Sequence, residues 1–213
     1  MKVQKDNRDF WNHIASNYEK SNIENNKKAY DDMLRLIILE LDIAMNVLEI
    51  ATGTGYVALR IAQFCNHIEA TDFSEEMIKI TKSREVTNNL SFSIQDATEL
   101  DYPDNTFNAV IISNALHVMP NPQKALVEIR RVLKEDGVLI APTFTKSDSF
   151  IEKMIEIPML FVGKMVGFKT FSKWTYEQYL DFIRDNHWVI EKSNRVEARF
   201  PLAYVVAKKT RNT

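Results

Sequence analysis

A small-residue turn in the first half of the chain carries the strongest chemical signal. An apolar run leads into Glu49-Ile50-Ala51-Thr52-Gly53-Thr54-Gly55, which holds two of the five glycines among 213 residues. Gly53 and Gly55 let the backbone bend sharply and let a ligand come close to it. An ordinary strand-to-helix turn often needs one glycine, so two at this spacing after the acidic Glu49 favour a ligand-binding turn.

Acidic residues near the ends of three successive apolar runs narrow the choice of ligand. A turn that binds a pyrophosphate would gain nothing from the negative charge of Glu49. A carboxylate suits a ligand with an ammonium group instead, and the methionine end of S-adenosylmethionine supplies one. Asp72 and Asp96 follow the next two apolar runs and could accept hydrogen bonds from the ribose hydroxyls and the adenine amino group. Gly53-x-Gly55-x-x-Ala58 also satisfies a loosened dinucleotide fingerprint, with Asp72 at a suitable distance for a ribose. A nucleotide-cofactor oxidoreductase is therefore the alternative.

His117 is the candidate for a catalytic base. It follows the fourth apolar run, near the place where a methyl group would be presented, and imidazole accepts a proton near neutral pH. A loop histidine bonded to the backbone is the other interpretation of this residue.

Alternating strands and helices must position these residues. Apolar runs predict strands at 47–50, 67–71, 90–95, 107–113 and 138–144, with helices at 56–64, 74–87 and from 122 until Gly137 ends it. Two closing strands, 187–192 and 202–208, have no helix between them and should pair antiparallel at a sheet edge. The pattern predicts an α/β fold, a Rossmann-like, mostly parallel seven-stranded sheet with helices on both faces and a C-terminal antiparallel hairpin.

The chain length predicts a single domain, residues 1–213, with four parts. Residues 1–45 are N-terminal helices, 46–144 the cofactor-binding core, 145–174 an apolar lid-like insertion, and 175–213 a closing helix and hairpin. An apolar lid over the acceptor pocket would favour a substrate with hydrophobic surface. A helical pair in the core or a dimer contact has the same composition, so the oligomeric state stays open.

In this order, the motifs resemble the class I S-adenosylmethionine-dependent methyltransferases, and among them the ubiquinone/menaquinone-biosynthesis group. The resemblance covers about residues 10–144 well and the remainder loosely. The motifs that carry it are Phe10-Trp11-x-x-x-Ala15-x-x-Tyr18, Val47 to Gly55, Ala70-Thr71-Asp72-Phe73-Ser74 with Met77, Gln95-Asp96-Ala97, and Asn114-Ala115-Leu116-His117 with 125–137.

The resemblance implies a role for most of the cofactor-binding set. Glu49, Gly53 and Gly55 would surround the methionyl part of the cofactor. Asp72 would hold the ribose, and Asp96 with the Ala97 backbone would hold the adenine. Asn114 would lie beside the sulfonium.

Four further residues complete the cofactor-binding set. Tyr18 could close over the cofactor or pack in the core, and Met77 could lie under the adenine or in the core. Phe73 belongs to the motif of Asp72. Ala51 stands where the family usually has glycine, a difference of one methyl group that bears on cofactor affinity.

Composition excludes several other classes of protein. The formal net charge is −2, so no basic field exists to hold nucleic acid. Cys65 is the only cysteine, which excludes an internal disulfide and a cysteine-based metal site and fits a reducing cytosol. No metal is expected. The apolar stretch 157–168 is too short to span a membrane, and Met1 to Asp9 is polar and charged, so a cytoplasmic protein is predicted.

The sequence therefore predicts an enzyme that transfers a methyl group from S-adenosylmethionine to a small, partly apolar molecule. The sulfonium is already a good leaving group, so the protein has chiefly to align the nucleophile with the methyl carbon. A non-catalytic S-adenosylmethionine-binding module is a second alternative beside the oxidoreductase.

Overall fold

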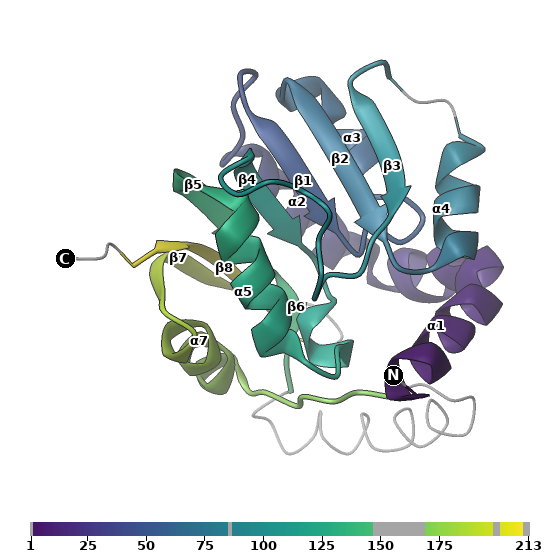
Figure 1. Cartoon of the computed structure of the whole chain (residues 1–213). Helices are drawn as coiled ribbons and strands as arrows, with labels where there is room; N and C mark the ends of the chain where they lie inside the picture. The colour runs from purple at the N-terminus through teal and green to yellow at the C-terminus, as the bar shows by residue number, and fades with distance from the viewer. Residues whose placement is uncertain (1, 85–86, 147–168, 198–200, 211–213) are drawn as a thin grey trace.

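A twisted, mostly parallel sheet runs through the molecule (Figure 1). The computed structural model describes residues 2–84, 87–146, 169–197 and 201–210. The strands are β1 Asn46–Ile50, β2 His67–Asp72, β3 Leu90–Ile94, β4 Phe107–Ile112, β5 Leu133–Ile140, β6 Thr143–Phe144, β7 Trp188–Val196 and β8 Leu202–Lys209. The α-helices in the described part of the chain are α1 Lys2–Ile14, α2 Lys27–Ile38, α3 Ala58–Ile61, α4 Glu75–Lys82, α5 Pro122–Val132 and α7 Tyr176–Asp185.

The strand order fits the fold predicted from the sequence. The strands β3, β2, β1, β4 and β5 lie side by side in that order, and each neighbouring pair is parallel. β8 follows β5 and is antiparallel to it, and β7 pairs antiparallel with the other side of β8. The C-terminal antiparallel hairpin at the sheet edge is therefore confirmed.

Helices cover both faces of the sheet, each over its own apolar cluster. The helices α2 and α3 pack on one face, where Met33, Ile37 and Ile61 are fully buried. The helices α5 and α7 pack on the other face, where Leu126, Ile129 and Tyr179 are fully buried. Figure 1 shows α5 and α7 in front of the strands and α2 and α3 behind them. A strand that is covered on both sides needs an almost continuous apolar run, as β4 has.

The region around the fifth strand differs from the prediction. The helix α5 ends at Val132, and Gly137 lies inside β5 instead of ending the helix. A Cβ atom on Gly137 would come within 2.7 Å of the Leu133 side chain and 3.0 Å of the Asn108 carbonyl oxygen, so this glycine allows two strands to approach. The predicted strand 138–144 is divided into β5 and β6, which gives eight named strands where seven were predicted.

Two helices are shorter than predicted. α3 has only four residues and continues as a 3₁₀ turn to Phe64, while α4 ends at Lys82 rather than near residue 87. Of the predicted insertion 145–174, residues 147–168 lie outside the described residues. Among the described residues, no helix is both long and apolar enough to cross a membrane.

Candidate functional site

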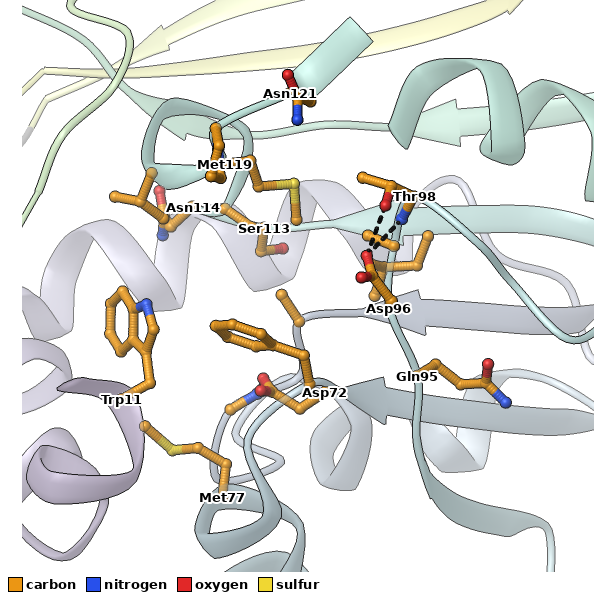
Figure 2. Close-up of a pocket in the computed structure, with 18 of the residues that line it drawn as sticks. Trp11, Asp72, Met77, Gln95, Asp96, Thr98, Ser113, Asn114, Met119 and Asn121 are labelled. Carbon is orange, nitrogen blue, oxygen red and sulfur yellow. Dashed lines mark hydrogen bonds between the residues drawn. The ribbon is translucent and has the colours of Figure 1, made fainter. Parts of the chain in front are cut away.

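A pocket opens at the carboxyl ends of the parallel strands, where open α/β sheets bind their ligands. Figure 2 shows side chains from the ends of β1, β2, β3 and β4 and from α1 around one hollow. The lining residues are Trp11, Tyr18, Ile50, Ala51, Gly53, Asp72, Phe73, Met77, Gln95, Asp96, Ala97, Thr98, Ser113, Asn114, Ala115, Val118, Met119, Pro120 and Asn121. Most of this lining is apolar, with acidic groups from two strand ends, and none of the described residues in it is a lysine or arginine.

Asp72 orders the backbone at the centre of the pocket. One carboxylate oxygen accepts a hydrogen bond from the Gly53 N–H at 2.9 Å, and the other accepts from the Ser74 N–H at 2.9 Å. Burial raises the pKa of Asp72 to about 6, although these backbone hydrogen bonds oppose the rise. The carboxylate thus joins the turn after β1 to the start of α4, and its oxygens keep lone pairs for ligand hydroxyls.

The two glycines of the turn have different reasons to be glycine. Both have a positive φ, +58° at Gly53 and +78° at Gly55. Among the described residues, a Cβ on Gly53 would meet only Tyr18, at 3.6 Å, whereas one on Gly55 would clash with Thr81 Cγ2. Gly55 therefore lets the turn pack against α4 and is not among the lining residues. Ala51 also has a positive φ, 57°, in a conformation that costs a residue with a Cβ about 1–2 kcal/mol.

Glu49 lies beneath the turn rather than in the wall of the pocket. Its side chain is only 2% exposed and accepts hydrogen bonds from the Thr52 hydroxyl, at 2.7 Å, and from the Ala58 backbone. Burial raises the pKa of Glu49 to about 8. The side chain therefore carries a proton at neutral pH and fastens the turn to α3. It is not one of the lining residues.

The segment after β3 is held from outside by α5. Within it, Asp96 Oδ1 accepts hydrogen bonds from the Thr98 N–H and hydroxyl at 2.9 and 2.8 Å, drawn as dashed lines in Figure 2. Arg131 donates to the Leu100 and Tyr102 carbonyl oxygens at 2.8 and 2.6 Å. Glu128 pairs with Arg131 and accepts from the Leu100 N–H at 2.9 Å. This clamp fixes the loop that places Asp96 in the pocket.

The N-terminal helix α1 and the turns that follow it contribute aromatic side chains to the pocket. Trp11 and Tyr18 lie edge to face, with ring centroids 5.9 Å apart, and both line the hollow. Ser74 donates from its hydroxyl to Asn12 Oδ1 at 2.6 Å while it caps α4 through the Met77 N–H. This contact docks α1 beside the segment that carries Asp72.

Asn114 stands at the end of β4 in a left-handed conformation, with φ 54°. Its N–H donates to the Pro142 carbonyl oxygen at 2.8 Å, and its side-chain Nδ2 donates to the Tyr30 hydroxyl at 3.4 Å. Tyr30 in turn shares a hydrogen bond with Tyr18. This three-residue chain crosses from α2 to the pocket wall, and Tyr30 itself is buried.

His117 is near the pocket but does not line it. Its Nδ1 lies 2.8 Å from the Thr143 hydroxyl, and its carbonyl oxygen accepts from the Phe171 and Ser172 N–H groups. Burial lowers the pKa of His117 to about 4, so the imidazole is neutral at physiological pH. The ring is therefore held by a side-chain hydroxyl rather than by the backbone, and an imidazole with this pKa is a weak base.

The pocket brings together most of the predicted cofactor-binding residues. Its lining includes Tyr18, Ala51, Gly53, Asp72, Phe73, Met77, Asp96, Ala97 and Asn114 and leaves out Glu49, Gly55 and His117. The apolar wall formed by Val118, Met119 and Pro120 was missed because nothing in its spacing marks it. Tyr30 was missed too, since its hydroxyl reaches Asn114 across 84 residues of sequence. Among the described residues, no cluster of His, Cys, Asp and Glu side chains could hold a metal ion.

Comparison with known proteins agrees with this geometry. Residues 48–141 match the family described as "Methyltransferase domain". A ubiquinone/menaquinone biosynthesis C-methyltransferase of Rickettsia akari is 32% identical over 150 residues, 65% of this chain and 60% of that protein. A demethylmenaquinone methyltransferase of Clavibacter sepedonicus is 36% identical over 100 residues, 46% of this chain and 41% of that protein. The chain thus spans less than two thirds of each of these relatives.

Two solved structures show the same fold. One is a methyltransferase in a complex with the Haloferax volcanii Trm112 activator, with a TM-score of 0.77 and 17% identity, covering 94% of this chain and 98% of that one. The other is DhpI in complex with SAH, with a TM-score of 0.73 and 17% identity, covering 98% and 97%.

Proposed function

Because residues 48–141 match the family described as "Methyltransferase domain", we propose that the chain transfers a methyl group from S-adenosylmethionine to a small, partly apolar molecule. The observation that carries the proposal is the pocket at the carboxyl ends of β1, β2 and β4, with Asp72 at its centre. A carboxylate at the end of β2 suits the two hydroxyls of a ribose. The apolar wall suits an adenine ring.

The lining residues fit the parts of this cofactor. Asp72 would accept the ribose hydroxyls, and Asp96 with the Ala97 backbone would meet the adenine edge. Phe73 and Met77 offer apolar surface to the ring, while Gly53 and Ala51 would lie along the methionyl part, with Asn114 and Tyr18 opposite. The cofactor supplies a sulfonium that already is a good leaving group. The protein's task is to hold the acceptor in line with the methyl carbon, and such positioning is worth roughly 7–11 kcal/mol.

The charge of the pocket lining bears on the kind of acceptor, and the cysteine content bears on the cellular location. Among the residues that the structure describes, the lining holds no lysine or arginine, which favours a neutral acceptor over a phosphorylated or nucleic acid one. We place the protein in the cytoplasm, which its single cysteine supports. We also propose that residues 1–213 form one domain. If the acceptor must lose a proton, His117 is the residue that we propose as the base.

Calorimetric titration with S-adenosylmethionine and S-adenosylhomocysteine tests this function. The wild type should bind both, and Asp72→Ala should bind both at least tenfold more weakly. Release of S-adenosylhomocysteine in the presence of neutral, apolar acceptors would then establish transfer. A folded wild type that binds neither compound would reject the proposal, and binding of a nicotinamide dinucleotide instead would support the oxidoreductase.

A further inference from the structure

The N-terminal segment brings two aromatic residues to the pocket, and a polar residue that docks the segment follows each of them. Trp11 and Tyr18 line the pocket, and Asn12 and Glu19 come directly after them. Asn12 Oδ1 accepts a hydrogen bond at 2.6 Å from the hydroxyl of Ser74, the N-cap of α4. Figure 1 shows α1 next to α4, as this contact requires. Glu19 makes the second docking contact, at the other end of the same helix.

The Glu19 carboxylate joins three segments of the chain at one oxygen atom. Its Oε1 accepts hydrogen bonds from the Thr54 hydroxyl at 2.7 Å and from the Arg84 guanidinium at 2.6 Å. Thr54 belongs to the glycine turn after β1 and is buried, while Arg84 lies just beyond the end of α4 at Lys82. Hydrogen bonds to an ionised group are roughly twice as strong as neutral ones. The N-terminal segment is therefore tied to the glycine turn and to α4 together.

The bonds of Glu19 act on two residues that line the pocket. Glu19 follows Tyr18 and Thr54 follows Gly53, so the bond between Glu19 and Thr54 brings two lining residues together. The Tyr18 ring rests against the turn, because its Cε1 lies 3.6 Å from the place where a Cβ on Gly53 would stand. In the described part of the chain, Glu19, Thr54 and Arg84 lie outside the pocket lining. They therefore order the wall of the pocket from behind.

The backbone changes its helical form at this junction. The helix α1 ends at Ile14, a 3₁₀ turn covers Ala15–Asn17, and a π-helical turn covers Glu19–Ile23. Turns of the π type are rare and are frequent at functional sites. A continuous α-helix would fix the direction of the Tyr18 side chain by itself. Because the helix is interrupted here, the side-chain bonds of Glu19 decide where the ring lies.

We propose that Glu19 is a positioning residue for cofactor binding. Through Thr54 and Arg84 it holds the Tyr18 ring against the glycine turn, and so it keeps S-adenosylmethionine in the pocket. The inference rests on the proposed function and adds to it a residue that does not touch the cofactor. Without the carboxylate, the buried Thr54 hydroxyl loses its acceptor and Arg84 loses its ion pair with Glu19. The Tyr18 ring is then free to leave the pocket wall, and the ligand dissociates sooner.

A double-mutant cycle with S-adenosylhomocysteine as the probe tests whether Glu19 acts through Tyr18. Calorimetric titration compares the wild type, Glu19→Ala, Tyr18→Ala and the double variant. We expect Glu19→Ala to bind about 5- to 10-fold more weakly, because hydrogen bonds to a charged group are lost at a partly exposed junction. In the Tyr18→Ala background the same substitution should weaken binding by at most about twofold, since the ring that Glu19 positions is already gone.

Further variants separate positioning from general damage. Glu19→Gln keeps an oxygen that can accept from Thr54, so it should recover part of the affinity that Glu19→Ala loses. Glu40→Ala removes a different ion pair between distant segments, with Lys192 at 2.8 Å, and should bind like the wild type. Hydrogen exchange in Glu19→Ala should rise in residues 10–20 and stay unchanged in β1 and β4. If Glu19→Ala does not fold, Thr54→Val, which removes only the hydroxyl, takes its place in the cycle.

Three results would overturn the assignment. Equal affinities for Glu19→Ala and the wild type would show that the carboxylate has no bearing on the cofactor. An equal loss with and without the Tyr18 ring would show that Glu19 acts by another route. A rise of hydrogen exchange in β1 and β4 as well would show that the substitution damages the whole fold. A wild type that binds no S-adenosylhomocysteine would instead reject the proposed function, whereas each of the other three results rejects this inference alone.

Discussion

The carboxylate of Asp72 accepts a hydrogen bond from the Gly53 N–H at 2.9 Å, which fastens the turn after β1 to the end of β2. The second oxygen of the same carboxylate accepts from Ser74, the N-cap of α4. A single side chain therefore orders two backbone segments: the turn at Gly53, 19 residues before Asp72 in the sequence, and the start of α4 at Ser74. A substitution at this position acts on the shape of the pocket as well as on any ligand it touches.

Asp72→Asn should weaken S-adenosylhomocysteine binding by at least tenfold. An amide has one acceptor oxygen, so its NH₂ group must face one of the two backbone N–H donors, and that donor is left unpaired. Calorimetric titration measures the change. Asp101→Asn, at an exposed position after β3, serves as the control and should bind like the wild type. Equal affinities for Asp72→Asn and the wild type would show that neither the second oxygen nor the charge matters.

Glu49→Gln should be more stable than the wild type at pH 8, with a smaller difference at pH 5. The pKa of Glu49 is raised to about 8 by burial, whereas an unfolded glutamate has a pKa of about 4.3. Between these values the folded state keeps a proton that the unfolded state releases, so the stability contribution falls by about 1.4 kcal/mol per pH unit as pH rises. Urea unfolding of both proteins at four pH values measures this. A difference that does not grow with pH would contradict it.

Ala51→Gly should stabilise the protein by a few tenths to about 1 kcal/mol. Relief of the left-handed strain at Ala51, worth about 1–2 kcal/mol, exceeds the backbone entropy that glycine adds to the unfolded chain, about 0.5–1 kcal/mol. The urea midpoint should rise while the slope stays constant. Ala58→Gly, in the buried helix α3, should have the opposite effect. A lower midpoint for Ala51→Gly would show that the methyl group contributes packing that outweighs the strain.

Arg131→Met should loosen the loop between β3 and β4 and weaken cofactor binding. The substitution leaves the Leu100 and Tyr102 carbonyl oxygens and Glu128 without their partner, at a cost of about 1–3 kcal/mol. Hydrogen exchange should rise in residues 96–104. Arg130→Met is a matched control on the same helix, because Arg130 binds the His187 and Thr210 carbonyl oxygens instead. Equal hydrogen exchange in the two variants would show that Arg131 does not order residues 96–104.

His117→Ala should lower turnover by the same factor at every pH from 6 to 8, with cofactor affinity unchanged. Burial lowers the pKa of His117 to about 4, so the imidazole stays neutral across this range and adds no titration to the rate. Its effect on turnover would come through the contact with Thr143. A ratio of wild-type to variant rates that rises as pH passes through 6.5 would instead identify a titrating base.

The sequence was sufficient for those parts of the site that depend on local pattern. The turn with Gly53, the acids Asp72 and Asp96 and the antiparallel hairpin all follow from alternation and strand ends, and residues at the ends of parallel strands meet by topology. Glu49 has the same local signature as Asp72. Only the three-dimensional arrangement shows that Thr52 and the Ala58 backbone take up its oxygens, because sequence spacing does not tell which side of a turn a side chain faces.

Other features depend on contacts between distant segments. In the sequence, Gly137 indicates the end of a helix, because glycine is common just after the last helical residue. Its actual place beside Asn108 in the sheet depends on the register between β4 and β5. The link from Tyr30 to Asn114 joins α2 to β4, and no periodicity predicts it. Likewise, Gly55 is glycine because Thr81 lies against it, a packing reason that looks in sequence like a ligand-binding one.

The position of β8 between β5 and β7 sets an order on folding during synthesis. A ribosome releases residues 133–140 well before 202–209, so the outer edge of β5 waits unpaired while the intervening chain is made. An unpaired apolar strand edge is the surface through which nascent chains aggregate. β8 must enter between two strands and bond on both sides, which makes its insertion a late and non-local step. Pauses in translation before residue 202 would prolong the time during which the β5 edge is unpaired. A chaperone that covers this edge would reduce aggregation during that time.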